Sequence, residues 1–460
     1  MYAQVPDGAN LYDADSLRTG EWVLYYDSLD HKVIKDSAFV YCLLSFERGV
    51  PTTDMTCYYT SGIKQWEGGM SSIDPDIKEG ACTYYYPLGT VLAEGMYKND
   101  LATGQYTGYY ENGQLQQSGL MKDGKNTGFW EYYHDNGQLM SKGTLVEGLQ
   151  DGPWEFYFEN GQIQTKGIAK NGKYNGEWII YFPNGQANDI STYVDNNKTG
   201  RNRVYFESGQ LASEGYYKDN VQDGHHIYYH ENGQLQSQGE IRAGRYEGKW
   251  DFYYANGNIA SNRVYVDDNE NGYFKYYFED GTLKSEGLVK DNQWNGDVTF
   301  YYSNGNIQSQ GYIKEGKYEG PWLTNYESGA RKINRVYVAD IENGLWEFFA
   351  ENGTQTERGM MVNAQLDGFW EYHHPNGQLS YSGTYEGGVR KGYFEYYNAD
   401  GTAIRQGAYH GDRKEGPFKY FYDDDILKSE GDFENDARVG HWIFYLTNGA
   451  ISTQGEYIDG

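Results

Sequence analysis

Apolar and polar positions along the chain follow a pattern that repeats every 24 residues. Turn glycines stand at positions 89, 113, 137, 161, 185, 209, 233, 257, 281, 305, 329, 353, 377, 401 and 449, and Asp425 fills the one missing place. Nine residues before each of these positions stands another glycine, from Gly80 to Gly440. Such regular spacing is the signature of a repeat architecture, and it predicts sixteen repeats in phase over residues 80–460.

Each repeat predicts two β-strands joined by a tight turn. The segment Gly128–Leu139 reads Gly-Phe-Trp-Glu-Tyr-Tyr-His-Asp-Asn-Gly-Gln-Leu, with rings before the turn and a branched apolar residue after it. Aromatic residues favour a pleated surface, and Asn-Gly between two such runs is a strong hairpin signal. A helix is excluded, because no apolar spacing of 3.6 residues survives between such frequent glycines. We therefore expect an all-β protein, an elongated array of tandem antiparallel β-hairpins in a continuous twisted or coiled sheet.

The turn admits two types. A type I′ turn needs a positive φ at both central residues, and Leu88 would be strained there. A type I turn with a G1 bulge needs a positive φ only at the glycine, and it accepts proline at its first central position, where Pro87, Pro183 and Pro375 stand. We favour the bulged turn, which places rings on both faces of the sheet. Which face is exposed to water stays open.

A longer period of 72 residues lies within the first. The glycine six residues after the turn is replaced at Ser191, Arg263 and Arg335. Duplication of a block of three repeats accounts for this spacing. The structural alternative is that three hairpins complete one coil of the array.

Residues 1–79 fit the repeat poorly. Gly20–Tyr26 and Tyr58–Ile63 resemble two degenerate repeats that are out of phase, and atypical terminal repeats usually cap an array. We predict an N-terminal cap over 1–79 and the regular array over 80–460. The first residues, Met1-Tyr-Ala-Gln4, resemble the end of a cleaved signal peptide, which favours export to the periplasm, outer surface or extracellular space over the cytoplasm.

Composition excludes several classes of partner. The chain has 38 Lys and Arg against 66 Asp and Glu, a net charge of -28. Phosphate backbones and anionic membrane surfaces need basic patches, so we expect no nucleic acid and no membrane partner. The sequence has no run of 18 apolar residues, so we expect no segment that inserts into a bilayer.

Candidate chemistry is sparse. Cys42 and Cys57 could form one disulfide, but with the odd third cysteine, Cys82, we favour small buried residues. The histidines His225, His226, His230, His373 and His374 stand where other repeats carry rings, so we interpret them as ring replacements. The acidic runs Asp267–Gly272 and Asp423–Asp425 read as solvated loops. Because a catalytic site needs one unique constellation and these columns recur, we predict no enzyme, no cofactor and no metal.

The motif in Gly128–Leu139 resembles the MORN-repeat variant family, some bacterial members of which are labelled antitoxins. The resemblance covers about 380 of 460 residues. It implies tandem antiparallel hairpins in an extended sheet and a scaffolding or binding role in a bacterial protein.

Three functions compete. The first is a non-enzymatic scaffold that binds a protein partner, with self-association also open. The second is a carbohydrate- or cell-wall-binding array that uses Tyr and Trp platforms. The third is an antitoxin-like partner-binding protein. The candidate binding surface is the tyrosine column four residues before the turn: Tyr109, Tyr133, Tyr157, Tyr181, Tyr205, Tyr229, Tyr253, Tyr277 and Tyr301.

Overall fold

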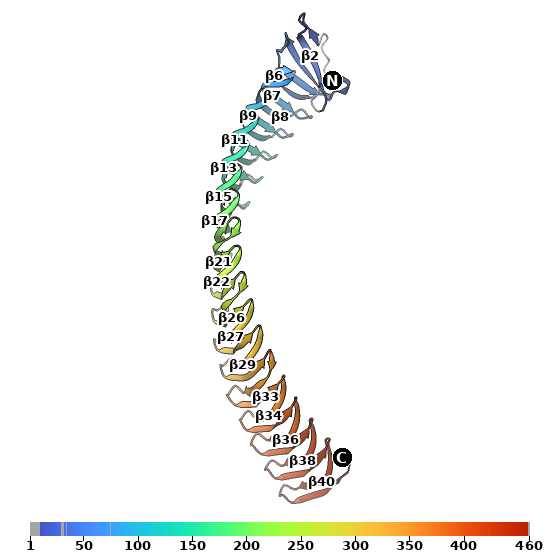
Figure 1. The fold of residues 1–460 in the computed structure, drawn as a ribbon, viewed down its shortest axis with the longest axis vertical. Helices are drawn as coiled ribbons and strands as arrows, with labels where there is room; N and C mark the ends of the chain where they lie inside the picture. The colour runs from blue at the N-terminus through green and yellow to red at the C-terminus, as the bar shows by residue number, and fades with distance from the viewer. Residues whose placement is uncertain (1–9, 29–31, 34, 74, 459–460) are drawn as a thin grey trace. The chain divides into compact units, whose positions relative to one another are not determined.

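The described part of the chain forms antiparallel strands and one short 3-10 turn. A computed structural model describes residues 10–28, 32–33, 35–73 and 75–458. The chain divides into two compact units, residues 1–233 and 234–460. In each unit, most strands that follow one another in sequence are paired as antiparallel neighbours, which gives an open ribbon of hairpins (Figure 1). The predicted fold class is therefore confirmed.

The first unit holds the 3-10 turn η1 (Lys35–Ser37) and twenty strands. These are β1 (Leu11–Tyr12), β2 (Arg18–Tyr26), β3 (Val40–Glu47), β4 (Val50–Pro51), β5 (Met55–Tyr59), β6 (Lys64–Ile73), β7 (Asp76–Tyr85), β8 (Val91–Lys98), β9 (Leu101–Tyr109), β10 (Leu115–Lys122), β11 (Lys125–Tyr133), β12 (Leu139–Val146), β13 (Leu149–Tyr157), β14 (Ile163–Lys170), β15 (Lys173–Tyr181), β16 (Ala187–Val194), β17 (Asn197–Tyr205), β18 (Leu211–Lys218), β19 (Val221–Gln222) and β20 (Gly224–Tyr229).

The second unit continues the same pattern. Its strands are β21 (Leu235–Arg242), β22 (Arg245–Tyr253), β23 (Ile259–Val266), β24 (Asn269–Glu270), β25 (Gly272–Tyr277), β26 (Leu283–Lys290), β27 (Gln293–Tyr301), β28 (Ile307–Lys314), β29 (Lys317–Asn325), β30 (Arg331–Val338), β31 (Ile341–Glu342), β32 (Gly344–Phe349), β33 (Gln355–Val362), β34 (Gln365–His373), β35 (Leu379–Glu386), β36 (Val389–Tyr397), β37 (Ala403–His410), β38 (Arg413–Phe421), β39 (Leu427–Glu434), β40 (Ala437–Tyr445) and β41 (Ile451–Tyr457).

The turn inside each hairpin is the bulged type I turn that we predicted. Between β11 and β12, the Gly137 N–H donates to the His134 carbonyl at 2.9 Å, and Gly137 has a φ of +82°. The preceding Asn136 has no positive φ, so only the glycine is left-handed. A second irregularity follows at once, because Tyr133 pairs with Leu139 but Tyr132 pairs with Ser141. Tyr133 and Leu139 therefore share one face and Tyr132 lies on the other, which gives rings on both faces.

The connection from one hairpin to the next is a type I′ turn, which sequence reasoning left unassigned. Val146 pairs with Leu149, and the two residues between them, Glu147 and Gly148, have φ values of +51° and +83°. The Gly148 N–H also donates to the Asn126 carbonyl, 22 residues earlier, at 2.8 Å. Each turn on this edge is thereby tied to the strand of the preceding repeat.

The opposite edge carries a second set of ties between repeats. The Asn136 side chain donates to the Glu159 carbonyl at 3.1 Å, 23 residues ahead, and the Tyr110 hydroxyl donates to the Tyr133 carbonyl at 2.7 Å. Similar bonds recur at Asn112, Asn184, Asn256, Asn304 and Asn376. The turn asparagine thus links neighbouring repeats as well as forming the turn.

One face of the ribbon, the packed face, buries an aromatic side chain against a glycine. Gly143 lies directly opposite Trp154, and a Cβ on this glycine would come within 2.3 Å of the indole. The rings then continue from repeat to repeat, with centroids 5.8 Å apart between Trp130 and Tyr132 and 6.4 Å between Tyr132 and Trp154. The glycine six residues after the turn therefore provides the space into which the aromatic ring of the next hairpin packs.

The three exceptions at the 72-residue spacing replace this contact by another. Ser191 faces Asn202 in place of a ring, and the Asn202 amide donates to the Ser191 hydroxyl at 2.9 Å. Arg263 lies between two rings, 4.7 Å from the centroid of Phe252 and 4.9 Å from that of Tyr276. Arg335 lies 5.8 Å from the centroid of the Trp346 ring. Each exception keeps the packed face filled.

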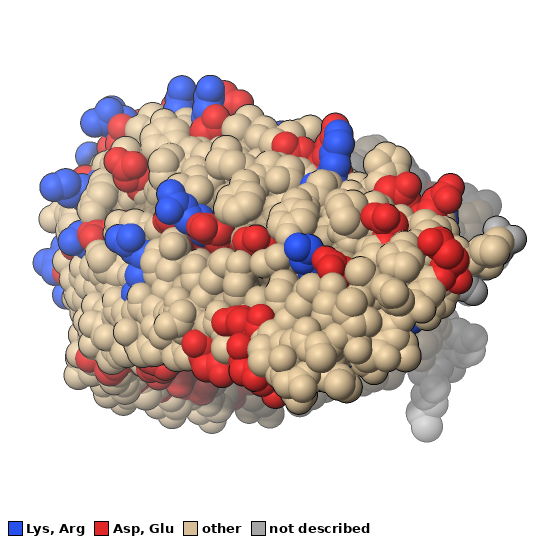
Figure 2. All heavy atoms as spheres, turned by 90° about the horizontal axis from the view of Figure 1, so that it is seen from below, with Lys and Arg blue, Asp and Glu red and all other residues tan. Residues whose placement is uncertain are grey.

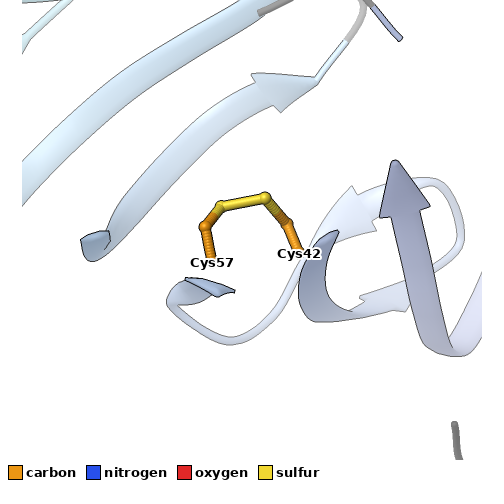
Figure 3. Close-up of a disulfide and its surroundings, with 2 residues drawn as sticks. All are labelled: Cys42 and Cys57. Carbon is orange, nitrogen blue, oxygen red and sulfur yellow. A yellow bond between two sulfur atoms is a disulfide. The ribbon is translucent and has the colours of Figure 1, made fainter. Parts of the chain in front are cut away.

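The strands before residue 74 surround a separate core. Trp22, Val40, Leu44, Phe46 and Met55 are buried together with Cys42 and Cys57, which lie opposite each other on β3 and β5 and form a disulfide (Figure 3). The three cysteines are buried as expected, but the preference for three separate thiols was wrong for this pair. Cys82 keeps its thiol, and burial raises its pKa to about 11.

Three predictions concern the N-terminal residues: a degenerate repeat, the boundary of the cap, and a trace of a signal peptide. Tyr59 and Gly62 form the same bulged turn as the regular repeats, with the Gly62 N–H donating to the Tyr59 carbonyl at 2.8 Å. The boundary between a cap over 1–79 and an array over 80–460 stays a prediction. The segment that suggested a signal peptide, residues 1–4, lies outside the described residues.

Candidate binding face

The second face of the ribbon, the open face, carries side chains in three parallel rows. In the hairpin of β11 and β12, the cross-strand pairs are Phe129 with Thr144, Glu131 with Lys142, and Tyr133 with Leu139. Because the same positions recur every 24 residues, each pair extends into a row that crosses the hairpins within each unit. We call these the apolar row, the charged row and the tyrosine row.

The nine predicted tyrosines form the tyrosine row. Each is the last residue of its strand, from Tyr109 in β9 to Tyr301 in β27, and all nine are half-buried. Half-burial means that each ring packs within the sheet and also keeps part of its surface accessible. The row stays a candidate surface.

Four of the nine hydroxyls of this row, those of Tyr109, Tyr133, Tyr157 and Tyr301, donate to carboxylates of the charged row. Tyr133 donates to Glu131 at 2.9 Å, and Tyr301 donates to Glu286 at 2.7 Å. The hydroxyls of Tyr273 and Tyr301, with the Lys275 ammonium, lower the pKa of Glu286. Burial, together with this carboxylate, raises the pKa of Tyr301 to about 12. At neutral pH, the tyrosine row and the charged row beside it therefore present neutral tyrosine rings and ionised carboxylates side by side.

The apolar row was missed by sequence reasoning. Phe129 is 53% exposed, Phe369 57% and Tyr393 51%, although all three are large and apolar. Other members of the row that are also exposed are Met96, Leu120, Ile168, Tyr216, Tyr273, Leu288, Tyr312, Leu345 and Met360. The available signal was the residue between the glycine and the tryptophan in Gly-Phe-Trp, which we treated as a variable position.

Some exposed apolar residues are direct neighbours rather than isolated. Tyr273 pairs with Leu288 across β25 and β26, and Leu345 pairs with Met360 across β32 and β33. Single exposed apolar side chains are common in any protein, whereas adjacent ones aligned on one face indicate an interaction surface.

Charge on the open face is mixed. Lys142 and Glu155 are 3.1 Å apart, and Lys275 and Glu286 are 3.2 Å apart, each across neighbouring strands. Seen from below in Figure 2, Lys and Arg side chains lie mainly toward the upper left, and Asp and Glu side chains gather at the right and in the lower part, with uncharged surface between them.

The histidines replace rings, as predicted. His226 is buried against Gly215, at the repeat position that holds Trp130 and Trp154 in other hairpins. The Nε2 atom of His374 lies 3.0 Å from the Tyr397 carbonyl, where other repeats place a tyrosine hydroxyl. The acidic residues Asp267 and Asp268 form a type I′ turn, and Asp425 takes the left-handed position of a turn glycine. Among the described residues, no group of three or more His, Cys, Asp or Glu converges as a metal site would require.

Comparison with known proteins agrees with the repeat. The model of the MORN repeat variant matches ten segments of the chain, residues 78–99, 102–123, 127–146, 150–171, 198–219, 222–242, 246–267, 270–291, 294–315 and 414–435. No curated protein sequence matches.

Among solved structures, the chain is similar to the TcdB2-TccC3-Cdc42 structure, with 11% identity, a TM-score of 0.14, and coverage of 96% of this chain and 24% of that one. It is also similar to a Photorhabdus luminescens Tc holotoxin pore, with 10% identity, a TM-score of 0.15, and coverage of 98% and 30%. The chain thus spans less than a third of those chains, and the likeness carries no argument about function. No helix in the described part of the chain has the length and apolar character to cross a bilayer.

Proposed function

Because its repeats belong to the MORN repeat variant family, we propose that this protein is a non-enzymatic scaffold that binds a protein partner along its open face. The observation that carries the proposal is the apolar row. Neighbouring repeats pack together through the buried rings of the packed face. Exposed pairs such as Tyr273 and Leu288 therefore have no role in packing the core.

The chemistry of the face describes the partner. An apolar row beside a charged row of both signs fits a partner surface with an apolar strip flanked by residues of both charges. The tyrosine row is less suited to binding a sugar, because four of its nine hydroxyls are already bound to carboxylates. A protein partner is therefore favoured over a glycan on this face.

The disulfide supports a location outside reducing compartments. Disulfides persist in secreted and periplasmic proteins and are rare in the cytosol. The Cys42–Cys57 bond thus agrees with export of a bacterial protein.

The test compares partner capture by two matched variants. One carries Tyr273→Ser and Leu288→Ser in the apolar row. The control carries Val266→Ser and Val338→Ser, which are similarly exposed but lie beside type I′ turns at the edge. Proteins retained by the immobilised parent are identified, purified and titrated against all three forms.

We expect the row variant to bind at least about tenfold more weakly, which is about 1.4 kcal/mol, and the control to bind like the parent. Equal affinity of the parent and the row variant, or retention of a glycan with no protein, would refute the proposal.

A further inference from the structure

A cavity of about 360 Å³ lies in the first unit, where the strands before residue 74 meet the first regular repeat. We call it the cap cavity. Its apolar floor includes Val40, Met55, Met70 and Leu92. The volume falls in the range of about 300–1,000 Å³ that is typical of small-molecule sites, toward its lower end.

Aromatic rings form one wall of the cap cavity. Trp66 on β6 lies directly opposite Tyr84 on β7, with stacked rings whose centroids are 6.3 Å apart. Tyr59 and Tyr85 also line the cavity. All four rings are half-buried, so part of each remains accessible from the cavity.

The strands behind this wall are tightly packed. A Cβ on Gly68 would come within 2.5 Å of the Cys82 sulfur, and one on Gly69 within 2.0 Å of the Glu79 carbonyl. The disulfide of Cys42, itself a lining residue, joins β3 to β5 on another side. The cavity is therefore held by a preformed frame, which is what specific binding of a small ligand requires.

Four polar side chains at the cavity define which ligand it can take. Lys78 lies 5.6 Å above the Trp66 ring and 5.9 Å above the Tyr84 ring, so a lysine ammonium already occupies the place of a cation over these rings. A cationic ligand is disfavoured for that reason. Asp76 and Asp100 line the same cavity, and each lies beside a lysine: Asp100 is 3.9 Å from Lys78, and Asp76 is 3.1 Å from Lys32. These charges are balanced, so the cavity favours neither a net anion nor a net cation.

A neutral molecule with many hydroxyls and one apolar face satisfies all of these groups. Its hydroxyls can donate to Asp76 and Asp100 and accept from Lys78 and Gln65, and its C–H face can pack on the parts of the aromatic wall that Lys78 does not cover. We propose that the cap cavity binds a neutral mono- or disaccharide. This site is separate from the open face and does not depend on the scaffold function.

Saturation-transfer NMR with the full chain tests this site. The probes are glucose, N-acetylglucosamine, maltose and cellobiose at millimolar concentrations, with tetramethylammonium and citrate as a cationic and an anionic probe. Tryptophan fluorescence then gives the affinity of any saccharide that receives saturation.

The variant Asp76→Asn/Asp100→Asn removes both carboxylates while keeping size, and Trp66→Phe shortens the aromatic wall. Asp340→Asn is the matched control, because Asp340 and Asp100 occupy the same position of a type I′ turn. Hydrogen exchange of residues 55–85 shows that each variant keeps its fold.

We expect at least one saccharide to bind, with at least a tenfold loss of affinity in the double variant, a smaller loss in Trp66→Phe and no change in the control. Absence of saccharide binding, saccharide binding that survives both cavity variants, or binding of only the charged probes would overturn the assignment.

Discussion

Replacing Gly143 with alanine should open its hairpin, because the added methyl group has no room. The new Cβ would lie within 2.3 Å of the Trp154 ring, whereas carbon atoms in contact are about 3.5–4.0 Å apart. The ring must therefore move by more than about 1 Å. Trp154 is only 2% exposed and is held between Tyr132 and Phe156, so it has little space to move into.

The expected magnitude follows from this collision. Overpacking of a well-packed core costs about 1–3 kcal/mol, and loss of a buried tryptophan costs about 3–5 kcal/mol if the ring is expelled. Gly455 is the matched control, since it stands at the same repeat position and a Cβ there meets nothing within 4 Å. At Gly455, alanine should be neutral or stabilise by up to about 1 kcal/mol, so the two substitutions differ in sign.

Local hydrogen exchange is the assay, because a repeat array need not unfold in one step. Exchange over residues 139–157 should speed up in Gly143→Ala, while Gly455→Ala should leave that segment unchanged. A serine–asparagine pair that copies Ser191 and Asn202 offers a rescue: Gly143→Ser with Trp154→Asn should be less destabilised than Trp154→Asn alone. Unchanged protection in Gly143→Ala would show that the ring does not rest on this glycine.

Three further predictions concern a turn, the disulfide and a carboxylate. Gly137→Ala places a side chain at a φ of +82° and should cost about 1–3 kcal/mol, seen as faster exchange of β11 and β12 but not of distant repeats. Cys57→Ser should destabilise the first unit by about 2–4 kcal/mol, and a reductant should lower the unfolding temperature of the parent but not of the variant. Because the pKa of Glu286 is lowered in the folded state, its ionised carboxylate stabilises the fold at pH values above its ordinary pKa of 4.5. This contribution is lost as the pH falls through the folded-state pKa. The difference in unfolding temperature between the parent and Glu286→Gln should therefore shrink below that pH.

The hairpin and its turn could be predicted because each depends on local chemistry. Pro87 and Leu88 exclude a type I′ turn by their own backbone limits, and the structure has the bulged turn. The glycine six residues after the turn could be recognised as structural, but its partner could not. Gly143 contacts Trp154 only because β12 pairs with β13 in one register. The residue spacing within one hairpin does not determine the register between neighbouring hairpins.

The candidate surface was predictable in part for a related reason. Tyr133 stands out by composition, whereas Phe129 looks like an arbitrary residue between glycine and tryptophan. Its exposure follows from the alternation of faces beside the buried Trp130, which requires knowing that the packed face is the one that carries tryptophan. The cap cavity could not be predicted, because it depends on how the irregular strands before residue 74 meet β7.

The variation of the open face from repeat to repeat separates a protein partner from a repetitive glycan. On the packed face, the position seven residues before the turn holds Trp in eight of the sixteen repeats and Phe in three, since most hairpins pack a ring against a glycine. The neighbouring open-face position changes instead, and in successive repeats it holds Phe129, Pro153, Glu177, Arg201, His225 and Lys249. A polymer with identical sugar units would need the same platform in each repeat, whereas a folded protein presents a different chemical group at each step. The side chains of the open face differ from repeat to repeat in this way, which is why the scaffold proposal places a protein there and sugar binding is assigned to the cap cavity.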